Sequence, residues 1–260
     1  MRLATWNVNS LKARLDRVLA WTEAQQPDVL CLQETKLSDD AVPLLDFRAL
    51  GYDVAHHGLG QWNGVAIASR IGLEEVRAGL PAADGWTDDG GRFLAATCGG
   101  VRVASIYVPN GRAVDSEFYL AKLEWLERLS RWLDDNDPAT EQAICGDYNV
   151  APEDADVWDV NAVHGATHVS PRERAAVAKL RAWGMVDVVR QFHPEPGFFS
   201  WWDYRAGHFH KNFGMRIDHV YVTPALAARA VAAERDRDAR KPSTYPGIPS
   251  DHAPLIVDFS

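Results

Sequence analysis

The segment Ala143-Ile-Cys-Gly-Asp-Tyr-Asn-Val-Ala-Pro152 indicates both a class of fold and the place of a functional site. Its first four residues are small or apolar, which is typical of a buried strand, and Asp147 and Asn149 follow directly. Residues two positions apart on extended chain point to the same side. The pair is therefore suited to hold one phosphate and one water, whereas the alternative is an Asx-type turn that only closes the strand.

Other predicted strands also end in polar groups, which favours a site over a simple turn. Binding sites are commonly built where strand ends bring polar side chains together around a concave surface. The strand-end polar groups are Asn7 and Asn9, Glu34, Asn110, Asp218, and Asp251-His252.

The composition predicts one large folded domain over residues 1–260. Apolar residues make up 47% of the chain and include ten Trp, which excludes a disordered protein and supplies a large core. The first residues lack a cleavable apolar segment, and no run approaches the roughly 20 apolar residues of a membrane span. We therefore expect a soluble, cytoplasmic protein.

The cysteines and the charge bound the chemistry further. Cys31, Cys98 and Cys145 lie in apolar runs without a Cys-x-x-Cys partner, so buried reduced thiols are favoured over a disulfide or a zinc site. The net charge of −9 and the pI near 5.4 argue against a nucleic-acid partner. That objection weakens if a cation neutralises a carboxylate cluster, because global charge does not describe one face.

The predicted elements begin with strand, helix and strand, continue as antiparallel hairpins, and then alternate. Ser10 caps a helix that stops before Pro27, and Ser170 and Glu173 form a capping box for a helix that Gly184 ends. A long helix begins at 115 or 116, and we expect its core face to carry Phe118, Leu120, Leu123, Leu126, Leu129 and Leu133. The expected strands are 2–8, 28–33, 52–57, 65–69, 73–77, 93–98, 101–108, 143–146, 216–222 and 255–259.

Hairpins combined with crossovers predict a four-layered α/β sandwich, in which two mixed β-sheets pack face to face with helices outside. Residues 3–8 and 144–150 also resemble each other, since each is a strand that ends in Asn-Val. This similarity predicts two sheets related by a rough two-fold axis. The segment 205–214 is polar and is expected to be a loop.

Seven blocks in order resemble the exonuclease III family of abasic-site endonucleases, within the endonuclease/exonuclease/phosphatase superfamily. They span nearly the whole chain: Asn7-Val-Asn9, Leu32-Gln-Glu-Thr-Lys36, Tyr107-Val-Pro-Asn-Gly111, Gly146-Asp-Tyr-Asn149, Phe199-Ser-Trp-Trp-Asp-Tyr204, Arg216-Ile-Asp218 and Ser250-Asp-His-Ala-Pro254. The resemblance implies a monomeric, metal-dependent DNA repair nuclease that cuts duplex DNA 5′ to abasic sites. It also implies 3′–5′ exonuclease and 3′-end phosphatase or phosphodiesterase activity.

The resemblance assigns Glu34 to a metal ion, with Asn7 and Asp251 as supporting ligands. Oxygen ligands favour Mg²⁺, for which Mn²⁺ is expected to substitute, and no Cys/His cluster offers a zinc alternative. The alternative for Glu34 is an ordinary surface acid.

The catalytic roles implied by the resemblance fall on five residues. Asp147 orients or deprotonates the water and Asn149 holds it in line, although His252 is the alternative base. His252 contacts the scissile phosphate, with Asp218 fixing its tautomer and raising its pKa. Tyr107 donates to a phosphate oxygen, together with Asn110; the alternative for these two is packing at a strand end.

DNA contacts and a sugar pocket complete the expectations. The candidate phosphate contacts are Arg92, Asn110, Arg112, Lys122, Arg174, Arg205 and Lys211, each cation being otherwise a solvated surface charge. Trp201, Met215 and Ile217 match positions that line a pocket for a base-less sugar, with core packing as the alternative. Met215 replaces the larger aromatic residue of some members, which leaves the size of this pocket open.

Two other functions compete with this interpretation. One is another phosphoesterase of the superfamily, acting on lipid head groups, inositol phosphates or general DNA; the segment from Trp201 to Tyr204 argues against it. The other is a non-catalytic binding module, which would have lost at least one of Glu34, Asp147, Asn149 or His252. All four are present.

Overall fold

The computed structural model describes residues 1–81, 84–88 and 90–260. Within these residues, twelve strands form two sheets of six strands each. The first sheet has the spatial order β11 (Ala230–Arg235), β12 (Leu255–Phe259), β1 (Arg2–Asn7), β2 (Val29–Gln33), β4 (Val65–Ser69) and β3 (Asp53–His57). The second has the order β5 (Glu74–Ala78), β6 (Phe93–Cys98), β7 (Val101–Tyr107), β8 (Gln142–Asp147), β10 (Asp218–Val222) and β9 (Val186–Asp187).

The two sheets repeat one pattern of strand pairing. β1 is parallel to β2 and antiparallel to β12, and β8 is parallel to β7 and antiparallel to β10. The remaining pairs of both sheets are antiparallel. The mixed sheets and their matching order agree with the two-fold relation that the Asn-Val repeat predicts.

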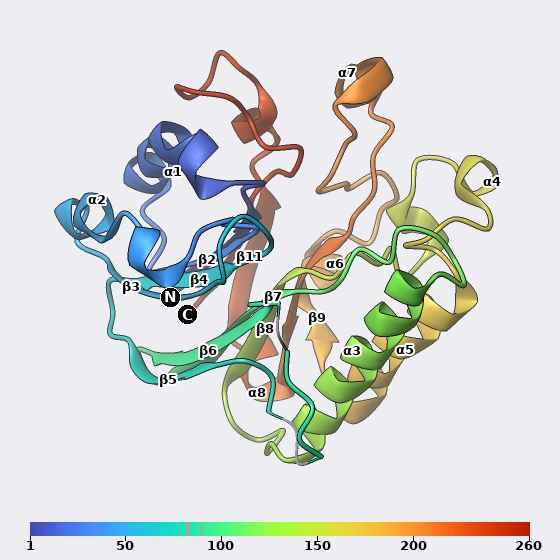
Figure 1. Cartoon of the computed structure of the whole chain (residues 1–260), viewed down its shortest axis with the longest axis horizontal. Helices are drawn as coiled ribbons and strands as arrows, with labels where there is room; N and C mark the ends of the chain where they lie inside the picture. Colours follow the sequence, from blue (N-terminus) through green and yellow to red (C-terminus); the bar gives the residue numbers. More distant parts are fainter. Residues whose placement is uncertain (82–83, 89) are drawn as a thin grey trace.

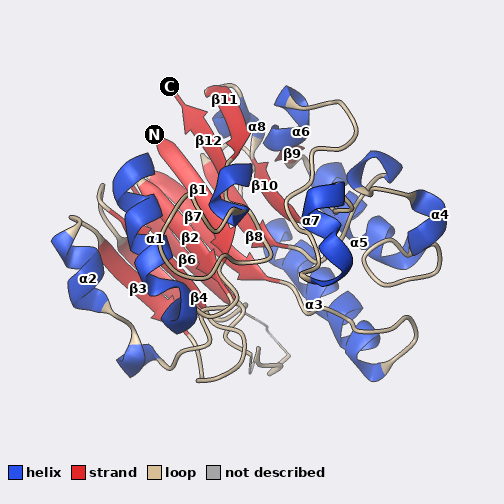
Figure 2. Cartoon of the chain, turned by 90° about the horizontal axis from the view of Figure 1, so that it is seen from above, coloured by secondary structure: helices blue, strands red, loops and turns tan. Residues whose placement is uncertain are grey.

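The helices are α1 (Leu11–Gln25), α2 (Leu44–Ala49), α3 (Glu117–Asp134), α4 (Val160–Val163), α5 (Pro171–Trp183), α6 (Val188–Phe192), α7 (His208–Lys211) and α8 (Pro224–Ala227). Figures 1 and 2 show α1 and α2 against the outer face of the first sheet and α3 and α5 against that of the second. The short helices α6 and α8 instead place Val188, Val189 and Leu226 in the core between the sheets. α1 and α2 share a buried cluster with the first sheet, and α3 and α5 share one with the second. The predicted four-layered α/β sandwich is confirmed.

Alternation along the strands builds the central core. In β2, Val29 and Cys31 face the second sheet, while Leu30 and Leu32 face the helices. Side chains of a strand point alternately to its two faces, so a strand covered on both faces must be apolar throughout. All three cysteines are buried and free, in line with reduced thiols.

Both predicted helix caps are present. The Ser10 side chain accepts from the Ala13 N–H, and Ser170 and Glu173 form the reciprocal capping box at the start of α5. The predicted core face of α3 was partly wrong, because Phe118 and Leu120 are 40% and 50% exposed. Helical spacing back from the buried leucines leads instead to Tyr119 and Lys122, both of which are buried.

Three local predictions differ from the structure. The expected strand over 216–222 begins only at Asp218, since Met215 makes isolated bridges to Val157 and Trp201. The segment 205–214 contains the short helix α7 and a 3₁₀ turn. β11 was not expected, because Ala233 is its one buried residue and the strand lacks the apolar alternation of a half-buried strand.

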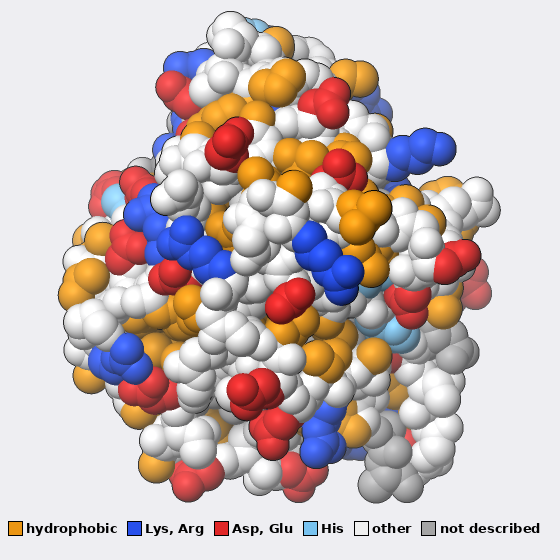
Figure 3. Space-filling view, turned by 90° about the vertical axis from the view of Figure 1, so that its left-hand side faces the viewer, with side chains coloured by type: hydrophobic (Ala, Val, Ile, Leu, Met, Phe, Trp, Pro, Cys, Tyr) orange, Lys and Arg blue, Asp and Glu red, His pale blue; other side chains and the backbone are white. Residues whose placement is uncertain are grey.

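Charge on the surface is mixed. The face shown in Figure 3 carries acidic and basic side chains interspersed with hydrophobic ones. The net charge of −9 therefore does not produce a single acidic surface on this side. None of the helices in the described part of the chain has the length and apolar character that a bilayer crossing requires.

Candidate active site

Polar side chains from both sheets meet at one edge of the sandwich. Asn7, Tyr107 and Asp147 are the last residues of β1, β7 and β8. Glu34 directly follows β2, and Asp218 is the first residue of β10, which runs antiparallel to β8. The parallel pairs β1–β2 and β7–β8 end at the same edge, so strands far apart in the sequence present their terminal side chains together.

Asn7 joins the acidic groups of the two sheets. Its amide nitrogen donates to Glu34 Oε1 at 2.8 Å and to Asp147 Oδ2 at 2.9 Å. Its oxygen accepts from the backbone N–H of Asn9 at 2.9 Å. Asn7 thus orients both carboxylates through its nitrogen, and its role as a supporting metal ligand, which the resemblance implied, stays a prediction.

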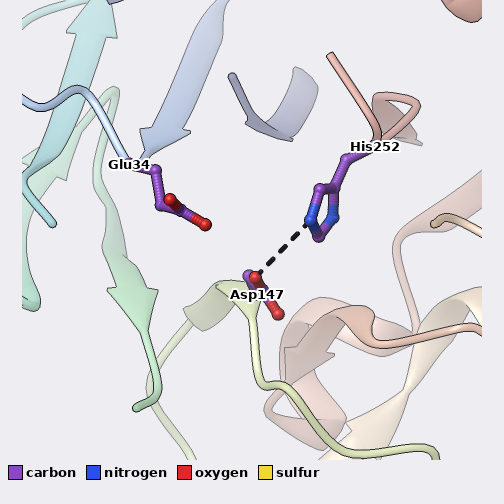
Figure 4. Close-up of side chains that lie close together, drawn as sticks. All are labelled: Glu34, Asp147 and His252. Carbon is purple, nitrogen blue, oxygen red and sulfur yellow. Dashed lines mark ion pairs between the residues drawn. The ribbon is translucent and has the colours of Figure 1, made fainter. Parts of the chain in front are cut away.

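Glu34, Asp147 and His252 form a compact group that could hold a metal ion. One ligand atom from each lies within 4.8 Å of the others. Figure 4 shows the three side chains pointing toward a common space, with His252 Nε2 at 3.8 Å from Asp147 Oδ2. The oxygen donors of the two carboxylates fit Mg²⁺ or Mn²⁺.

His252 is buried and paired with Asp218. Its Nδ1 lies 2.8 Å from Asp218 Oδ2, which is the pairing that the family resemblance implied. Burial opposes the imidazolium charge, but the carboxylates of Asp218, Asp147 and Asp251 outweigh it and raise the pKa of His252 to about 10. At neutral pH the ring is a cation whose Nε2 is directed at Asp147, so it has no lone pair for a metal ion and the carboxylates of Glu34 and Asp147 would be the ligands of the group.

Asp147 occupies the centre of the site. Its Oδ1 accepts from the backbone N–H of Asn149 at 2.8 Å. Burial raises the pKa of this carboxyl to about 7, with the negative charges of Asp218 and Glu34 adding to the effect and His252 and Asn7 opposing it. Gly146 precedes it at φ +145°, and a Cβ there would lie 2.0 Å from the Ile106 carbonyl oxygen. Only glycine therefore allows β7 and β8 to approach at this point.

The carboxamide of Asn149 is fixed on both sides. Its nitrogen donates to the Val108 carbonyl at 2.9 Å, and its oxygen accepts from Asn110 at 3.1 Å. Tyr107 is buried beside Glu34 and Asp147; burial and these two negative charges raise the pKa of its hydroxyl well above the ordinary value. Tyr107 is therefore a protonated hydrogen-bond donor at neutral pH.

Several loops at this edge adopt a strained backbone. Positive φ is uncommon for residues other than glycine and clusters at functional sites. The non-glycine residues of this kind at the site are Asn9 (45°), Ser10 (89°), Glu34 (51°), Lys36 (54°) and Asn149 (51°).

Asp251 lies next to His252 and accepts from Asn9 and Trp201, with the Ser250 hydroxyl a longer contact at 3.5 Å from Oδ1. Asn9 Nδ2 donates to Oδ1 at 3.1 Å, and Trp201 Nε1 donates to Oδ2 at 3.0 Å. Lys36 Nζ donates to Asn9 Oδ1 at 2.6 Å and lies 3.0 Å from Glu34 Oε2. Sequence reasoning assigned no role to Lys36, although it is part of the Gln-Glu-Thr-Lys block.

Three of the candidate DNA contacts line a groove that begins at the site. The groove has a volume of about 840 Å³ and contains Glu34 and Tyr107 in its wall, together with Arg92, Asn110 and Arg112. Trp62 also lines it and is 70% exposed. Sequence reasoning missed Trp62, for which its place between Gly60 and Gly64 in a turn was the available signal.

The structure contradicts the prediction that Lys122 contacts a DNA phosphate. Its side chain is fully buried, and its ammonium pairs with the buried Glu173 and donates to the Asn149 carbonyl at 2.6 Å. The ammonium group cannot reach a phosphate from this position. It instead stabilises the loop that contains Asp147 and Asn149, because it donates to the Asn149 carbonyl. The error arose because a lysine was read as a surface charge.

The other candidate cations lie nearer the surface. Arg174 bonds the Ala151 carbonyl and Asp154, while Arg205 pairs with Asp203. Lys211 lies 5.8 Å from the ring of Phe213. Their contacts with DNA stay predictions.

The three expected pocket residues are together but mostly covered. Met215 and Ile217 are 8% and 3% exposed and share a cluster with Ala151 and Val157. Trp201 packs against this cluster and is partly exposed. Met215 and Ile217 are therefore mostly packed and Trp201 has the most free surface of the three, and their role as a sugar pocket stays a prediction.

Comparison with known proteins agrees with this site. The profile of the Endonuclease/Exonuclease/phosphatase family matches residues 4–252, so the chain belongs to that family. Exodeoxyribonuclease III of Haemophilus influenzae is 34% identical over 273 residues, covering all of both chains. An AP endonuclease from Archaeoglobus fulgidus has a TM-score of 0.93 and 38% identity, with 100% of this chain and 99% of that chain covered.

A 3′ phosphatase from Neisseria, solved with a product DNA hairpin, has a TM-score of 0.94 and 38% identity over 100% of this chain and 99% of that chain. Within the family, the chain is a phosphodiester hydrolase of the exodeoxyribonuclease III and AP endonuclease group of DNA repair nucleases.

Proposed function

We propose that the protein hydrolyses the phosphodiester bond 5′ to abasic sites in duplex DNA. We also propose 3′–5′ exonuclease and 3′-end phosphatase or phosphodiesterase activity, for which the Neisseria relative is the support. The observation that carries the proposal is the meeting of Glu34, Asp147 and the His252–Asp218 pair at one edge of the sandwich. Phosphodiester hydrolysis needs an oriented water, positive charge at the phosphate and a donor for the departing oxygen.

Glu34 would hold a Mg²⁺ ion, with Asp147 as a further carboxylate of the same group and Mn²⁺ the expected substitute. The donor set fits because both carboxylates are oriented by Asn7 and their oxygens keep lone pairs for a hard cation. A bound divalent cation supplies positive charge against the phosphate and the departing oxygen. Asp251 would be a supporting ligand, because each of its oxygens accepts a hydrogen bond and keeps a further lone pair.

The chain's own residues perform the remaining tasks. Asp147 and Asn149 orient the attacking water, because their side chains lie at the end of β8 and are fixed by Asn7, Asn110 and the Val108 carbonyl. His252, as a cation held by Asp218, opposes the phosphate charge. The protonated Tyr107 donates to a phosphate oxygen. We also propose that residues 1–260 act as one catalytic domain; the monomeric state and the cytoplasmic location stay predictions.

A cleavage assay tests the proposal. A labelled duplex with one abasic analogue is incubated with the protein and Mg²⁺, with the protein and a chelator, and with no protein. We expect one product cut 5′ to the analogue in the first reaction only, and a matched undamaged duplex cut only from its 3′ ends. Cutting at unmodified internal positions at the same rate would indicate a general nuclease instead.

A further inference from the structure

Trp201 contacts both the cluster of the expected sugar pocket and the loop that contains Asp251 and His252. Its backbone N–H donates to the Met215 carbonyl at 2.9 Å, and the Met215 N–H donates back at 3.0 Å. Its ring packs on the cluster that contains Met215 and Ile217. Trp201 also forms an isolated β-bridge with His252, and its indole N–H donates to Asp251 at 3.0 Å. The wall of the expected pocket is therefore bonded directly to the catalytic loop.

The contact with Asp251 is the first link of a polar chain. Asp251 accepts from Asn9, Asn9 accepts from Lys36, and Lys36 pairs with Glu34. Four segments remote in sequence are connected in this way, and the chain runs from the pocket wall to the expected metal carboxylate. The carboxylate of Asp251 is held by Trp201 and Asn9, so it should rotate more freely when the indole N–H of Trp201 is removed.

We propose that Trp201 is a positioning residue, whose indole N–H fixes the Asp251 carboxylate beside His252 while its ring forms the pocket wall. A sugar that seats against the ring then meets a catalytic loop already held in place. This inference rests on the proposed function, because it assigns a role within abasic-site cleavage. Its distinguishing feature is that the N–H and the ring act separately.

The variant Trp201→Phe separates these two parts, since it keeps an aromatic ring and removes the N–H. Hydrogen bonds to charged groups contribute enough that we expect single-turnover cleavage of an abasic duplex to slow about tenfold. Binding of the same duplex in chelator should change by less than about twofold. Unchanged cleavage with weakened binding would overturn the proposal and leave Trp201 as a pocket wall alone.

Trp202→Phe is the matched control. Trp202 is the next residue, is fully buried, and donates its indole N–H to Asn212 at 3.1 Å, away from the catalytic carboxylates. The same substitution there should leave the cleavage rate within about twofold. An equal loss in both variants would assign the effect to packing and overturn the proposal.

A double-mutant cycle identifies the partner. If Trp201 acts through Asp251, Trp201→Phe should slow cleavage about tenfold in the wild-type background and less than twofold in the Asp251→Ala background, which removes the acceptor. Losses that multiply in the double variant contradict action through Asp251.

An NMR measurement keeps the inference testable without catalysis. The indole ¹⁵N–¹H signal of Trp201 is identified by its absence in Trp201→Phe, and it should shift in Asp251→Asn while that of Trp202 stays in place. An unmoved signal shows that the contact does not form in solution. Failure of the proposed function would show differently, as wild-type protein that leaves the abasic duplex intact.

Discussion

Replacing Lys122 with methionine should destabilise the protein strongly while leaving the salt dependence of DNA binding unchanged. Glu173 Oε1 accepts from Lys122, from Thr167 at 2.8 Å and from the His168 N–H at 2.9 Å. The variant keeps only neutral donors around this fully buried carboxylate and removes a donor from the Asn149 carbonyl. Removing one partner of a buried ion pair costs about 3–5 kcal/mol, which we expect as the loss in free energy of unfolding.

Urea denaturation monitored by fluorescence measures this loss, as a lower midpoint at constant m-value. The loss should depend on pH. Burial disfavours the Glu173 carboxylate, but Lys122 and the surrounding hydrogen bonds lower its pKa below the ordinary value of 4.5. A lowered folded-state pKa stabilises the protein above the unfolded pKa, and that contribution is lost as pH falls through the folded pKa. The difference between wild type and variant should therefore be largest near neutral pH and shrink in acid.

Arg112→Met is the control, for which we expect nearly unchanged stability and a reduced salt dependence of DNA binding. Arg112 is exposed and lines the groove, so its loss should change stability by only about 0.5 kcal/mol. It should lower the slope of log affinity against log salt by about 0.9, as expected for one lost phosphate contact. Adding Glu173→Gln to Lys122→Met should restore part of the stability, because it removes the unpaired charge. A Lys122→Met protein with wild-type stability and a reduced salt slope would refute the buried position.

Glu34→Gln should lose Mg²⁺-dependent cleavage by orders of magnitude while duplex binding, measured by anisotropy, changes little; full activity in the variant would reject Glu34 as the metal carboxylate. Asp218→Asn and His252→Ala should each reduce kcat/KM severely and without additivity, because the two side chains act as one hydrogen-bonded pair. A double variant that shows the product of the single losses would contradict that pairing. Met215→Ala should lower the free energy of unfolding by about 2–5 kcal/mol, since the side chain is 8% exposed. Melting curves measured beside cleavage of paired abasic and undamaged substrates would show whether it also reduces abasic preference.

Most elements of the fold could be predicted from local sequence patterns. Apolar runs, the Ser170–Glu173 capping box and turn-forming glycines predicted the main strands and helices, because these signals act within a few residues. β11 escaped because its alanines and charges do not alternate as a half-buried strand should. Phe118 and Leu120 were wrongly assigned to the core face of α3 because that face was predicted from hydrophobic residues alone. The buried face of the helix includes Lys122 instead.

The site residues were predicted as types at strand ends, and of their connections the pairing of Asp218 with His252 was the one that the resemblance implied. The bond of Trp201 to Asp251 joins residues 50 positions apart, and that of Asn7 to Asp147 joins residues 140 apart. Such bonds depend on side-chain rotamers and on the stacking of two sheets, neither of which leaves a local signal. The burial of Lys122 depends in the same way on Glu173, 51 residues further along.

The pairing of β1 with β12 also sets when the site can exist. Arg2 lies opposite Asp258 in this pair, and His252 is in the loop just before β12. During synthesis, β1 emerges first and must wait for β12 before its outer edge is covered, and contacts so distant in sequence form slowly. A nascent chain in which β12 has not yet paired with β1 therefore lacks the His252 imidazole at the site, so competence for hydrolysis depends on a strand pairing between residues 256 positions apart.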